Sequence, residues 1–493
     1  TKTRRIKVKK TFSESRIVPL VVISLCIVAV LFISLKITSY GYIPGDDAMR
    51  HVAKAISGLD WDKILVIRED IKMDSHPGWH AILTVLYRAT NCSADDLMAF
   101  SVVSLFLIFC FVPLFFLERP ESWILALLAV SVTGHGFIFR LTSGRPYIFT
   151  MSTVLIFGFL WPRFRDKKIH WPSVILMTIS IAVSTWVHGL WYMFALPIAC
   201  LFAAREWRPG IIFSACAVSG IAIGASFTGR PFLFLGQILN HSIHSFSGHA
   251  VTRMLVVEFQ PSDGTPLMVA AVLAMLGWRA LRNSWSIKTI DNPLFFLGAA
   301  GWVSGLVVYR SWLDWGMPAI SAWMALEFQD FFTKTIGSYS WRRVGTVFFA
   351  GITLFLVDTS DLGGRWTNNL TIDYVSSENP DAASWLPEAD GVVYLTDMTL
   401  FYQTFYKNPK ARWRYILGFE PTWMKPDDLA IFRNILWNYG AFKSFEEWVK
   451  KMRPQDRLIV RHPSGKPPAI SGLEWYYAAT DTWIGRLPKN ISK

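Results

Sequence analysis

Two adjacent carboxylates, Asp46 and Asp47, follow a Pro-Gly turn just beyond the first long apolar segment of the chain. They lead into a short helix expected over 48–56, in which Asp47 and His51 stand four residues apart and share one face. One aspartate suits the N-cap of that helix, where its side chain accepts backbone N–H groups. A single cap does not need two carboxylates, so the context decides whether the other acts as a general base.

Arginines recur at comparable places later in the chain. Arg140 and Arg145 stand where one apolar segment ends and the next begins, and Arg310 stands in a similar place with Asp314. Charged side chains at membrane depth are expensive and usually mark a site, although a single arginine can also extend to lipid headgroups. The guanidinium group suits phosphate because its planar fork bonds two oxygens and stays charged.

Histidines gather in two polar segments. His76 and His80 lie in the segment after the first apolar run. The segment 228–265 carries His241, His244, His249, Arg253, Glu258 and Asp263. A divalent ion such as Mg²⁺ or Mn²⁺ could bind His241 and His244 together with Asp46 or Asp47. Solvated loop histidines are the commoner case, so this spacing favours a metal site only weakly.

The composition belongs to a membrane protein. The chain has 493 residues, of which 52% are hydrophobic, 15% are aromatic and 17% are charged. This is too apolar for an ordinary soluble protein. A formal net charge of +13 would suggest a nucleic-acid partner for a soluble chain, but in a membrane protein Lys and Arg mark the cytoplasmic loops. Membrane lipid is therefore an expected partner, and nucleic acid is not.

Eleven apolar segments are predicted to span the membrane as helices. They lie at 17–37, 95–117, 122–138, 146–161, 172–188, 190–204, 210–227, 266–281, 293–309, 316–333 and 343–357. Basic residues precede the first segment, which is too long for a signal peptide, and every second loop holds Lys or Arg. The positive-inside rule thus places the N-terminus in the cytoplasm, and a bacterial inner membrane is the expected location.

This orientation puts the unusual polar residues on the outer side. A transmembrane domain is expected over 1–357, with outer loops at 38–93 and 228–265. Residues 358–493 have the composition of a soluble domain and are predicted to form an extracytoplasmic α/β domain. Its helices are expected at 381–386, 426–439 and 444–452, and its strands at 391–396, 413–419, 457–461 and 475–487. None of the five cysteines lies there, so no disulfide staples this domain internally.

Three short motifs in this layout resemble the GT-C superfamily of membrane glycosyltransferases, which use polyprenyl-phosphate sugars. Asp46-Asp47-Ala48-Met49-Arg50 is similar to the acidic motif in the first outer loop of that superfamily. His76-Pro77 is similar to a His-Pro-Pro element of the lipid A aminoarabinose transferase and protein O-mannosyltransferase branch. Gly144-Arg145-Pro146-Tyr147 is similar to an Arg-Pro element at the outer end of a span in several bacterial members.

The chain also departs from those patterns. Asp47 stands where Glu is common and Gly78 where a second Pro is common, so the substrate of neither named enzyme is assigned. Trp312-Leu313-Asp314-Trp315-Gly316 is similar to the Trp-Trp-Asp-Tyr-Gly element of oligosaccharyltransferases. It lies between two predicted spans rather than in the outer domain, and the likeness is taken as accidental.

The resemblance implies transfer of a sugar from a polyprenyl-phosphate donor to a hydroxyl group of a lipid, glycan or protein. The catalytic base would be Asp46 or Asp47, with a slight preference for Asp46, and Asp47 would then orient the site or bind the metal ion. The residues expected to bind the donor phosphate are Arg145, Arg310 and Arg253. Those expected to contact substrate are His51, His76, His80 and Tyr147. The C-terminal domain is expected to position the acceptor.

Other functions stay open at this point. A polysaccharide ligase or polymerase would use a lipid-diphosphate donor at the same outer site. A transporter or flippase would place buried charges along a path and often consists of two similar halves, whereas this sequence has no internal repeat. A membrane-anchored sensor or scaffold would need a working motif in 358–493, where none is found.

Overall fold

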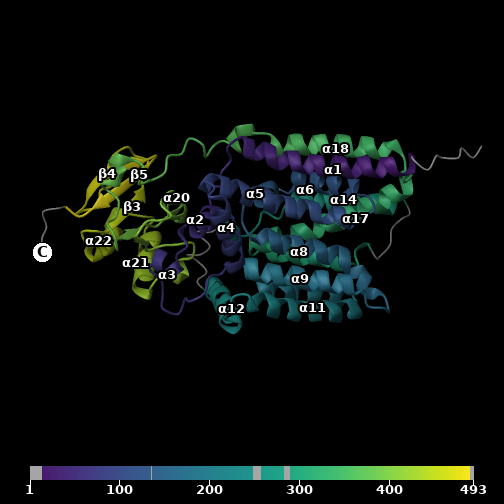
Figure 1. The fold of residues 1–493 in the computed structure, drawn as a ribbon, viewed down its shortest axis with the longest axis horizontal. Coiled ribbons are helices and arrows are strands. Elements are labelled where there is room, and N and C mark those ends of the chain that lie inside the picture. Colours follow the sequence, from purple (N-terminus) through teal and green to yellow (C-terminus); the bar gives the residue numbers. More distant parts are fainter. Residues whose placement is uncertain (1–13, 135, 248–256, 283–288, 489–493) are drawn as a thin grey trace, which may run out of the picture.

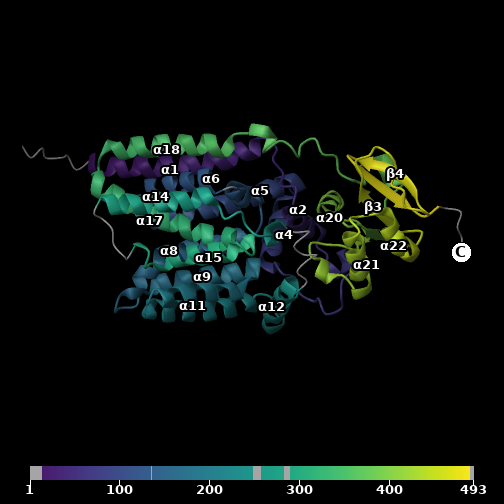
Figure 2. The same cartoon turned by 180° about the vertical axis from the view of Figure 1, so that it is seen from behind.

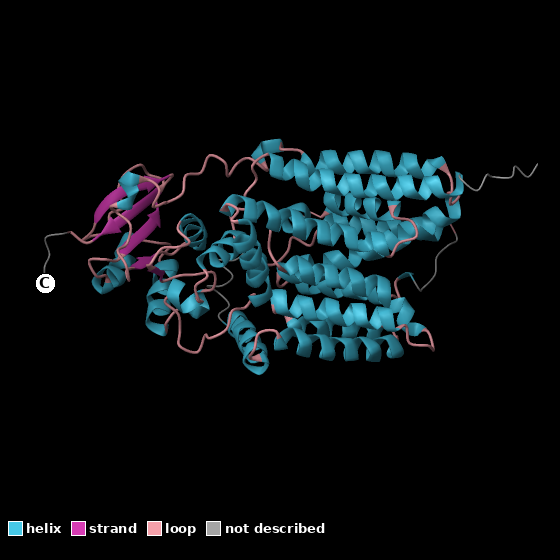
Figure 3. Ribbon diagram, viewed as in Figure 1, coloured by secondary structure: helices cyan, strands magenta, loops and turns pink. Residues whose placement is uncertain are grey.

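The computed structural model describes residues 14–134, 136–247, 257–282 and 289–488. Three parts follow one another along its long axis, as Figure 1 and, from behind, Figure 2 show. They are a bundle of long helices, a layer of short helices and a small domain. All described strands lie in that domain (Figure 3).

Helices form at all eleven segments predicted as membrane spans. They are α1 (Glu14–Ser39), α5 (Ala94–Phe111), α6 (Glu121–Thr133), α8 (Tyr147–Leu160), α9 (Trp171–His188), α10 (Ala195–Ala203), α11 (Trp207–Ser226), α14 (Pro266–Leu281), α15 (Pro293–Gly305), α17 (Met317–Thr335) and α18 (Trp341–Thr359).

Among the described helices, five are long and apolar enough to cross a membrane. They are Ile17–Ser39, Ala94–Phe115, Tyr147–Arg165, Trp171–His188 and Trp207–Ser226. Four further apolar helices are shorter, namely Glu121–Thr133, Trp191–Ala203, Pro266–Leu281 and Pro293–Gly305. The helix α6 is followed by Gly134, and α15 ends at Gly305. The chain is an integral membrane protein with fewer full-length spans than the eleven expected.

Four shorter helices lie between the bundle and the domain (Figure 1). They are α2 (Ala48–Ser57), α3 (Trp61–Ile64), α4 (Pro77–Thr90) and α12 (Pro231–Ser247). The helix expected over 48–56 is confirmed as α2, which is buried along most of its length. The segment 228–265, expected as a loop, instead contains α12 and the single turn η4 (Val257–Phe259).

The domain contains one five-stranded mixed sheet. Its strands are β1 (Val392–Tyr394), β2 (Arg414–Tyr415), β3 (Arg457–Arg461), β4 (Glu474–Ala479) and β5 (Thr482–Arg486), in the order β2-β1-β3-β5-β4. The first three run parallel, and β5 and β4 are antiparallel. The single strand expected over 475–487 is wrong, because the chain turns at Asp481, where φ is +53°, and forms a hairpin.

Helices cover this sheet. They are α19 (Pro380–Ala383), α20 (Met398–Lys407), α21 (Pro426–Trp437) and α22 (Glu446–Lys451). The sequence predicts all of them except α20. This helix packs its Phe401 ring 5.1 Å from that of Tyr415 in β2 and lies on the side of the domain that faces α2 (Figure 1).

The domain and the segment after α3 share backbone hydrogen bonds. The N–H of Val66 donates to the carbonyl of Tyr415, and the N–H of Arg68 donates to that of Trp423, both at 2.9 Å. Leu65 is thereby paired with Tyr415 and extends the sheet beyond β2. The segment after α3 and the domain therefore form one structure at the end of the bundle. The candidate site lies inside this structure.

Candidate active site

Asp47 lies at the start of α2 with its carboxylate buried among nitrogen groups. Nε of Arg50 donates to Oδ1, and Nη2 of Arg50 donates to Oδ2 at 3.0 Å. Nε of Arg145 lies 3.3 Å, and Nε2 of His51 3.6 Å, from Oδ2. Burial alone would raise the pKa of Asp47, but Arg50 and Arg145 outweigh it and hold the pKa well below its usual value. Asp47 is therefore an anion held between two guanidinium groups.

Asp46 has a different environment. Its Oδ1 accepts the N–H of Ala48 at 3.1 Å, and its Oδ2 lies 3.9 Å from Nη1 of Arg145. The side chain is 46% exposed, against 11% for Asp47. Partial burial raises the pKa of Asp46, and Arg145 compensates for this only in part. The capping hydrogen bond thus belongs to Asp46, while Asp47 lines the cavity described below.

Three arginines converge on one carboxylate, that of Glu258 in η4. Arg140 and Arg145 both donate to its Oε1, Arg145 at 2.7 Å, and Nε of Arg310 lies 3.9 Å from Oε2. Asp314 binds two of these arginines as well. Its carboxylate accepts hydrogen bonds from Arg140 at 2.6 and 2.9 Å and from Arg310 at 3.2 Å. Burial would raise the pKa of Glu258, but the arginines lower it to about 2.

Close backbone packing brings Asp314 and Arg310 to this place. Arg310 lies in α16 (Tyr309–Ser311), and Asp314 lies in the π-helical turn η6 (Trp312–Gly316). A side chain at Gly301 of α15 would come within 2.5 Å of the backbone of Gly316. Glycine at 301 therefore lets η6 lie directly on α15, with Asp314 buried beneath the arginines.

A chain of imidazoles begins beside Asp47. Nδ1 of His51 lies 2.8 Å from Nε2 of His80, and Nδ1 of His80 lies 2.5 Å from Oδ2 of Asp74. Oδ1 of Asp74 accepts the N–H of His76 at 3.0 Å. Burial, together with the neighbouring Arg50, lowers the pKa of His51 to about 3, so this imidazole is neutral at pH 7.

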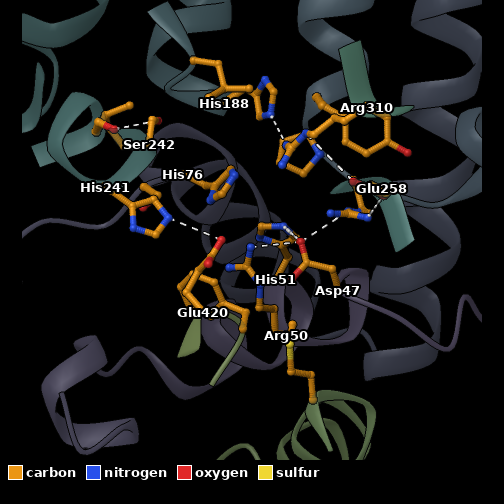
Figure 4. A pocket seen from close by; sticks show the side chains of 18 of the residues that line it. Asp47, Arg50, His51, His76, His188, His241, Ser242, Glu258, Arg310 and Glu420 are labelled. Atoms are coloured by element: carbon orange, nitrogen blue, oxygen red, sulfur yellow. Dashed lines mark hydrogen bonds and ion pairs between the residues drawn. The ribbon is translucent and has the colours of Figure 1, made fainter. Parts of the chain in front are cut away.

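These groups surround a cavity of about 110 Å³ between the bundle and the domain (Figure 4). Its charged and imidazole lining comprises Asp47, Arg50, His51, His76, Arg145, His188, His241, Glu258, Arg310 and Glu420. The domain contributes four lining residues, which are Met398, Tyr402, Phe419 and Glu420. A polar contact closes one wall, since Nε2 of His241 in α12 lies 3.3 Å from Oε1 of Glu420.

Three further clefts lie in this region. One of about 100 Å³ shares Arg310 with the cavity and includes apolar side chains, among them Leu190, Met193 and Trp315. Another, of about 540 Å³, lies on the side of Asp46. A third, of about 610 Å³, is strongly polar and is lined in part by Asp74. The acidic pair thus stands between two different spaces.

The structure brings most of the predicted site residues together. Arg145, Arg310, His51, His76 and Tyr147 line the cavity, and His80 lies directly behind His51. Arg253 lies outside the described residues, as does His249, and the side chain of His244 is also not described. His188, Tyr402 and Glu420 were not among the predicted site residues. His188 ends a predicted span, which is a usable signal, whereas Tyr402 and Glu420 have no such signal in the sequence.

The surroundings of Asp47 do not suit a metal ion. Both of its oxygens already accept from Arg50, so a cation there would stand directly against a guanidinium group. Within the described part of the chain, no group of three or more His, Cys, Asp or Glu side chains is arranged to hold a metal ion.

Comparison with known proteins gives a distant structural likeness. No family profile and no curated protein sequence matches the chain. Two crystal structures of the oligosaccharyltransferase of Archaeoglobus fulgidus are similar, one in complex with zinc and sulfate and one tethered by a disulfide to an acceptor peptide with the NVT sequon. Both are 12% identical, with TM-scores of 0.44 and 0.45. The alignments cover 88% and 89% of this chain and 67% and 69% of the other.

Proposed function

We propose that this protein is a membrane glycosyltransferase that moves a sugar from a polyprenyl-phosphate donor to a hydroxyl group of a lipid, glycan or protein on the extracytoplasmic side. One observation carries the proposal. In a single cavity, the guanidinium groups of Arg145 and Arg310 face the Asp47 carboxylate and the His51 imidazole. Such a cavity can hold a leaving phosphate at one side and take a proton from a hydroxyl at the other.

The arginines supply the phosphate subsite of this proposal. Arg145 and Arg310 already share one anion, the carboxylate of Glu258, so their donors point to a common place. A donor phosphate competes with Glu258 for that place. Charge-assisted, paired N–H donors then stabilise the negative charge that builds on the phosphate oxygen as the bond to the sugar breaks.

The neighbouring clefts fit the remaining parts of the substrates. The apolar lining beyond Arg310 suits the first isoprene units of the lipid. The cleft on the side of Asp46 carries the polar side chains of Gln403, Arg461 and Asp481 from the domain, which suits a hydroxylated acceptor. The acceptor oxygen then attacks the anomeric carbon from the side opposite the phosphate, which inverts that centre.

A lipid-diphosphate donor, as used by polysaccharide ligases and polymerases, is the second candidate. Its additional phosphate would need a third cation. Arg50 lines the cavity, but its side chain is 3% exposed and donates to both oxygens of Asp47. Arg140 is only 5% exposed, and its donors are bound by Asp314 and Glu258. The monophosphate donor therefore fits the described cavity better.

The test is sugar transfer by the purified full-length protein in lipid nanodiscs. Radiolabelled polyprenyl-phosphate and polyprenyl-diphosphate sugars are offered with a membrane-lipid extract as acceptor, and the release of free polyprenyl phosphate is followed. Arg145→Gln and Arg310→Gln are each expected to lower kcat/KM by about 100-fold or more. Arg165→Gln is the matched control, because Arg165 is half-exposed and pairs with Glu206 outside the site. Wild-type turnover with diphosphate donors alone, or with none, would overturn the proposal.

A further inference from the structure

Asp74, His80 and His51 form a buried row of side chains that ends at the cavity. Three features fix its geometry. The carboxylate of Asp74 accepts the N–H of His76, the residue just before α4. The amide of Gln237 in α12 binds the backbone of Lys72 and Met73 at 2.7 to 3.0 Å and so holds the chain just before Asp74. The ring of Trp61 lies 5.9 Å from that of His80 and covers it.

The hydrogen bonds determine which nitrogen of each imidazole carries the proton. An ionised carboxylate only accepts, so Nδ1 of His80 must carry the hydrogen that Asp74 receives. Nε2 of His80 then carries no hydrogen, so it must accept a hydrogen bond from Nδ1–H of His51. Nε2 of His51 is left without a proton. It is buried and lies 3.6 Å from Oδ2 of Asp47, beyond hydrogen-bond distance, in a side chain that lines the cavity.

The geometry points to His51 as the group that takes the proton of the acceptor hydroxyl, with Asp74 as the positioning residue that acts on it through His80. This inference rests on the proposed glycosyl transfer and names the base within it. It differs from the expectation drawn from the acidic motif, in which an aspartate is the base. Asp47 suits that task poorly, since Arg50 and Arg145 already hold its carboxylate.

Each proton and electron pair in this step has a defined destination. The acceptor O–H bond breaks, and its proton forms a new bond to Nε2 of His51. The acceptor oxygen bonds to the anomeric carbon, whose bond to the phosphate oxygen breaks with its electron pair remaining on the phosphate. The Nδ1 protons of His51 and His80 stay in place, and Asp74 stays ionised and holds both imidazoles in this tautomer. The site resets when the released phosphate takes the proton from Nε2.

Two carboxylates explain how a deeply buried imidazole can take a proton. A lone imidazolium would be unfavourable here, because Arg50 stands beside His51, and Lys54 as well as Arg50 stands near His80. The other titratable groups near His51 are His76, whose ring lies 4.9 Å away, His188 and Asp47. The new charge on His51 is offset by the Asp47 carboxylate, 3.6 Å from Nε2, and through His80 by the ionised Asp74.

Asp74→Asn is the decisive variant. The asparagine carbonyl can replace Oδ1 as acceptor for the N–H of His76, and its NH₂ group then donates to Nδ1 of His80. Both imidazoles must adopt the other tautomer, which puts a proton on Nε2 of His51. We expect kcat to fall by about 100-fold or more with an unchanged KM for the donor. Asp62→Asn is the control, because Asp62 lines the same polar cleft with a 60% exposed side chain and should leave kcat unchanged.

A second measurement does not depend on turnover. Nitrogen-15 NMR of histidine-labelled full-length protein reports the tautomer of each imidazole, and the His51 signal is assigned by its loss in His51→Gln. A bare Nε2 on His51 supports the inference, and a protonated Nε2 in the wild type overturns it. Full kcat in Asp74→Asn would overturn it as well, while glycosyl transfer by the wild type would still stand. Wild type inactive with every donor would instead remove the proposed function, and the role of His51 as its base with it.

Discussion

Oε1 of Glu258 lies 2.7 Å from Nη1 of Arg145 and also accepts from Arg140. The arginines of the cavity are thus already bound to an anion that belongs to the protein. Glu258 keeps three guanidinium groups together while no substrate is present, and a phosphate must displace it to reach them. The strength of this internal contact should limit the affinity of the donor.

Glu258→Gln should strengthen phosphate binding. The amide keeps the size of the side chain but removes the charge that competes with an incoming anion. We expect the affinity for a short-chain polyprenyl phosphate to rise by about tenfold, equivalent to about 1.4 kcal/mol. Thermophoresis of the purified protein at fixed ionic strength measures the dissociation constant. Glu69→Gln, a carboxylate on the polar cleft, serves as the control and should bind like the wild type.

The same carboxylate predicts a loss of stability in acid. The pKa of Glu258 is about 2 in the folded chain and 4.5 ordinarily, so folding favours its ionised form. This contribution, up to about 3 kcal/mol, is complete above pH 4.5 and is lost as the pH falls towards 2. Thermal unfolding between pH 6 and 3 should therefore show a shallower decline of Tm for Glu258→Gln than for the wild type. Equal slopes would show that Glu258 does not titrate in this way.

Asp314→Ala should destabilise the protein strongly. Asp314 is 1% exposed and accepts hydrogen bonds from Arg140 and Arg310. Its removal leaves the buried Arg140 charge with Glu258 alone, which is expected to cost about 3 to 5 kcal/mol. Glu447→Ala breaks only the exposed pair with Lys450 and should cost less than about 1 kcal/mol. Thermal unfolding of both variants in the same detergent makes the comparison, and similar losses would argue against the buried network.

Gly78→Ala should disturb the packing of α4 against α9. A side chain at 78 would lie 2.5 Å from Cδ2 of Trp186, which explains why this position is glycine. The expected loss is about 1 to 3 kcal/mol. Trp186→Leu removes the obstructing ring, so alanine at 78 should cost clearly less in that background. Unfolding of the two single variants and the double variant gives the coupling energy, and a value near zero would contradict the contact.

Much of the membrane part could be predicted because its signals are local. A run of apolar residues is visible in the sequence, and all eleven such runs are helices. The spacing of Asp47 and His51 also needs only one helical turn, and their side chains do approach each other. How many of these helices cross a bilayer is harder to predict, because it depends on the length and composition of each helix.

The wall of the cavity that the C-terminal domain supplies could not be predicted from local sequence signals. Tyr402 and Glu420 reach the cavity only because residues 65–68 pair with the domain, and pairing across such a distance leaves no periodic pattern. Helix α20 was missed because Phe401, Tyr402 and Phe405 have high strand propensity. Their burial between the sheet and α2 outweighs that preference.

The pairing of residues 65–68 with the domain also bears on how the protein is made. The ribosome produces Val66 long before Tyr415, so the 2.9 Å hydrogen bond between them joins two stages of synthesis. Until the domain has emerged and docked, the cavity lacks the wall that carries Tyr402 and Glu420. A chain still in synthesis therefore has an open cavity, and the proposed transfer should begin only after the domain has folded against α2.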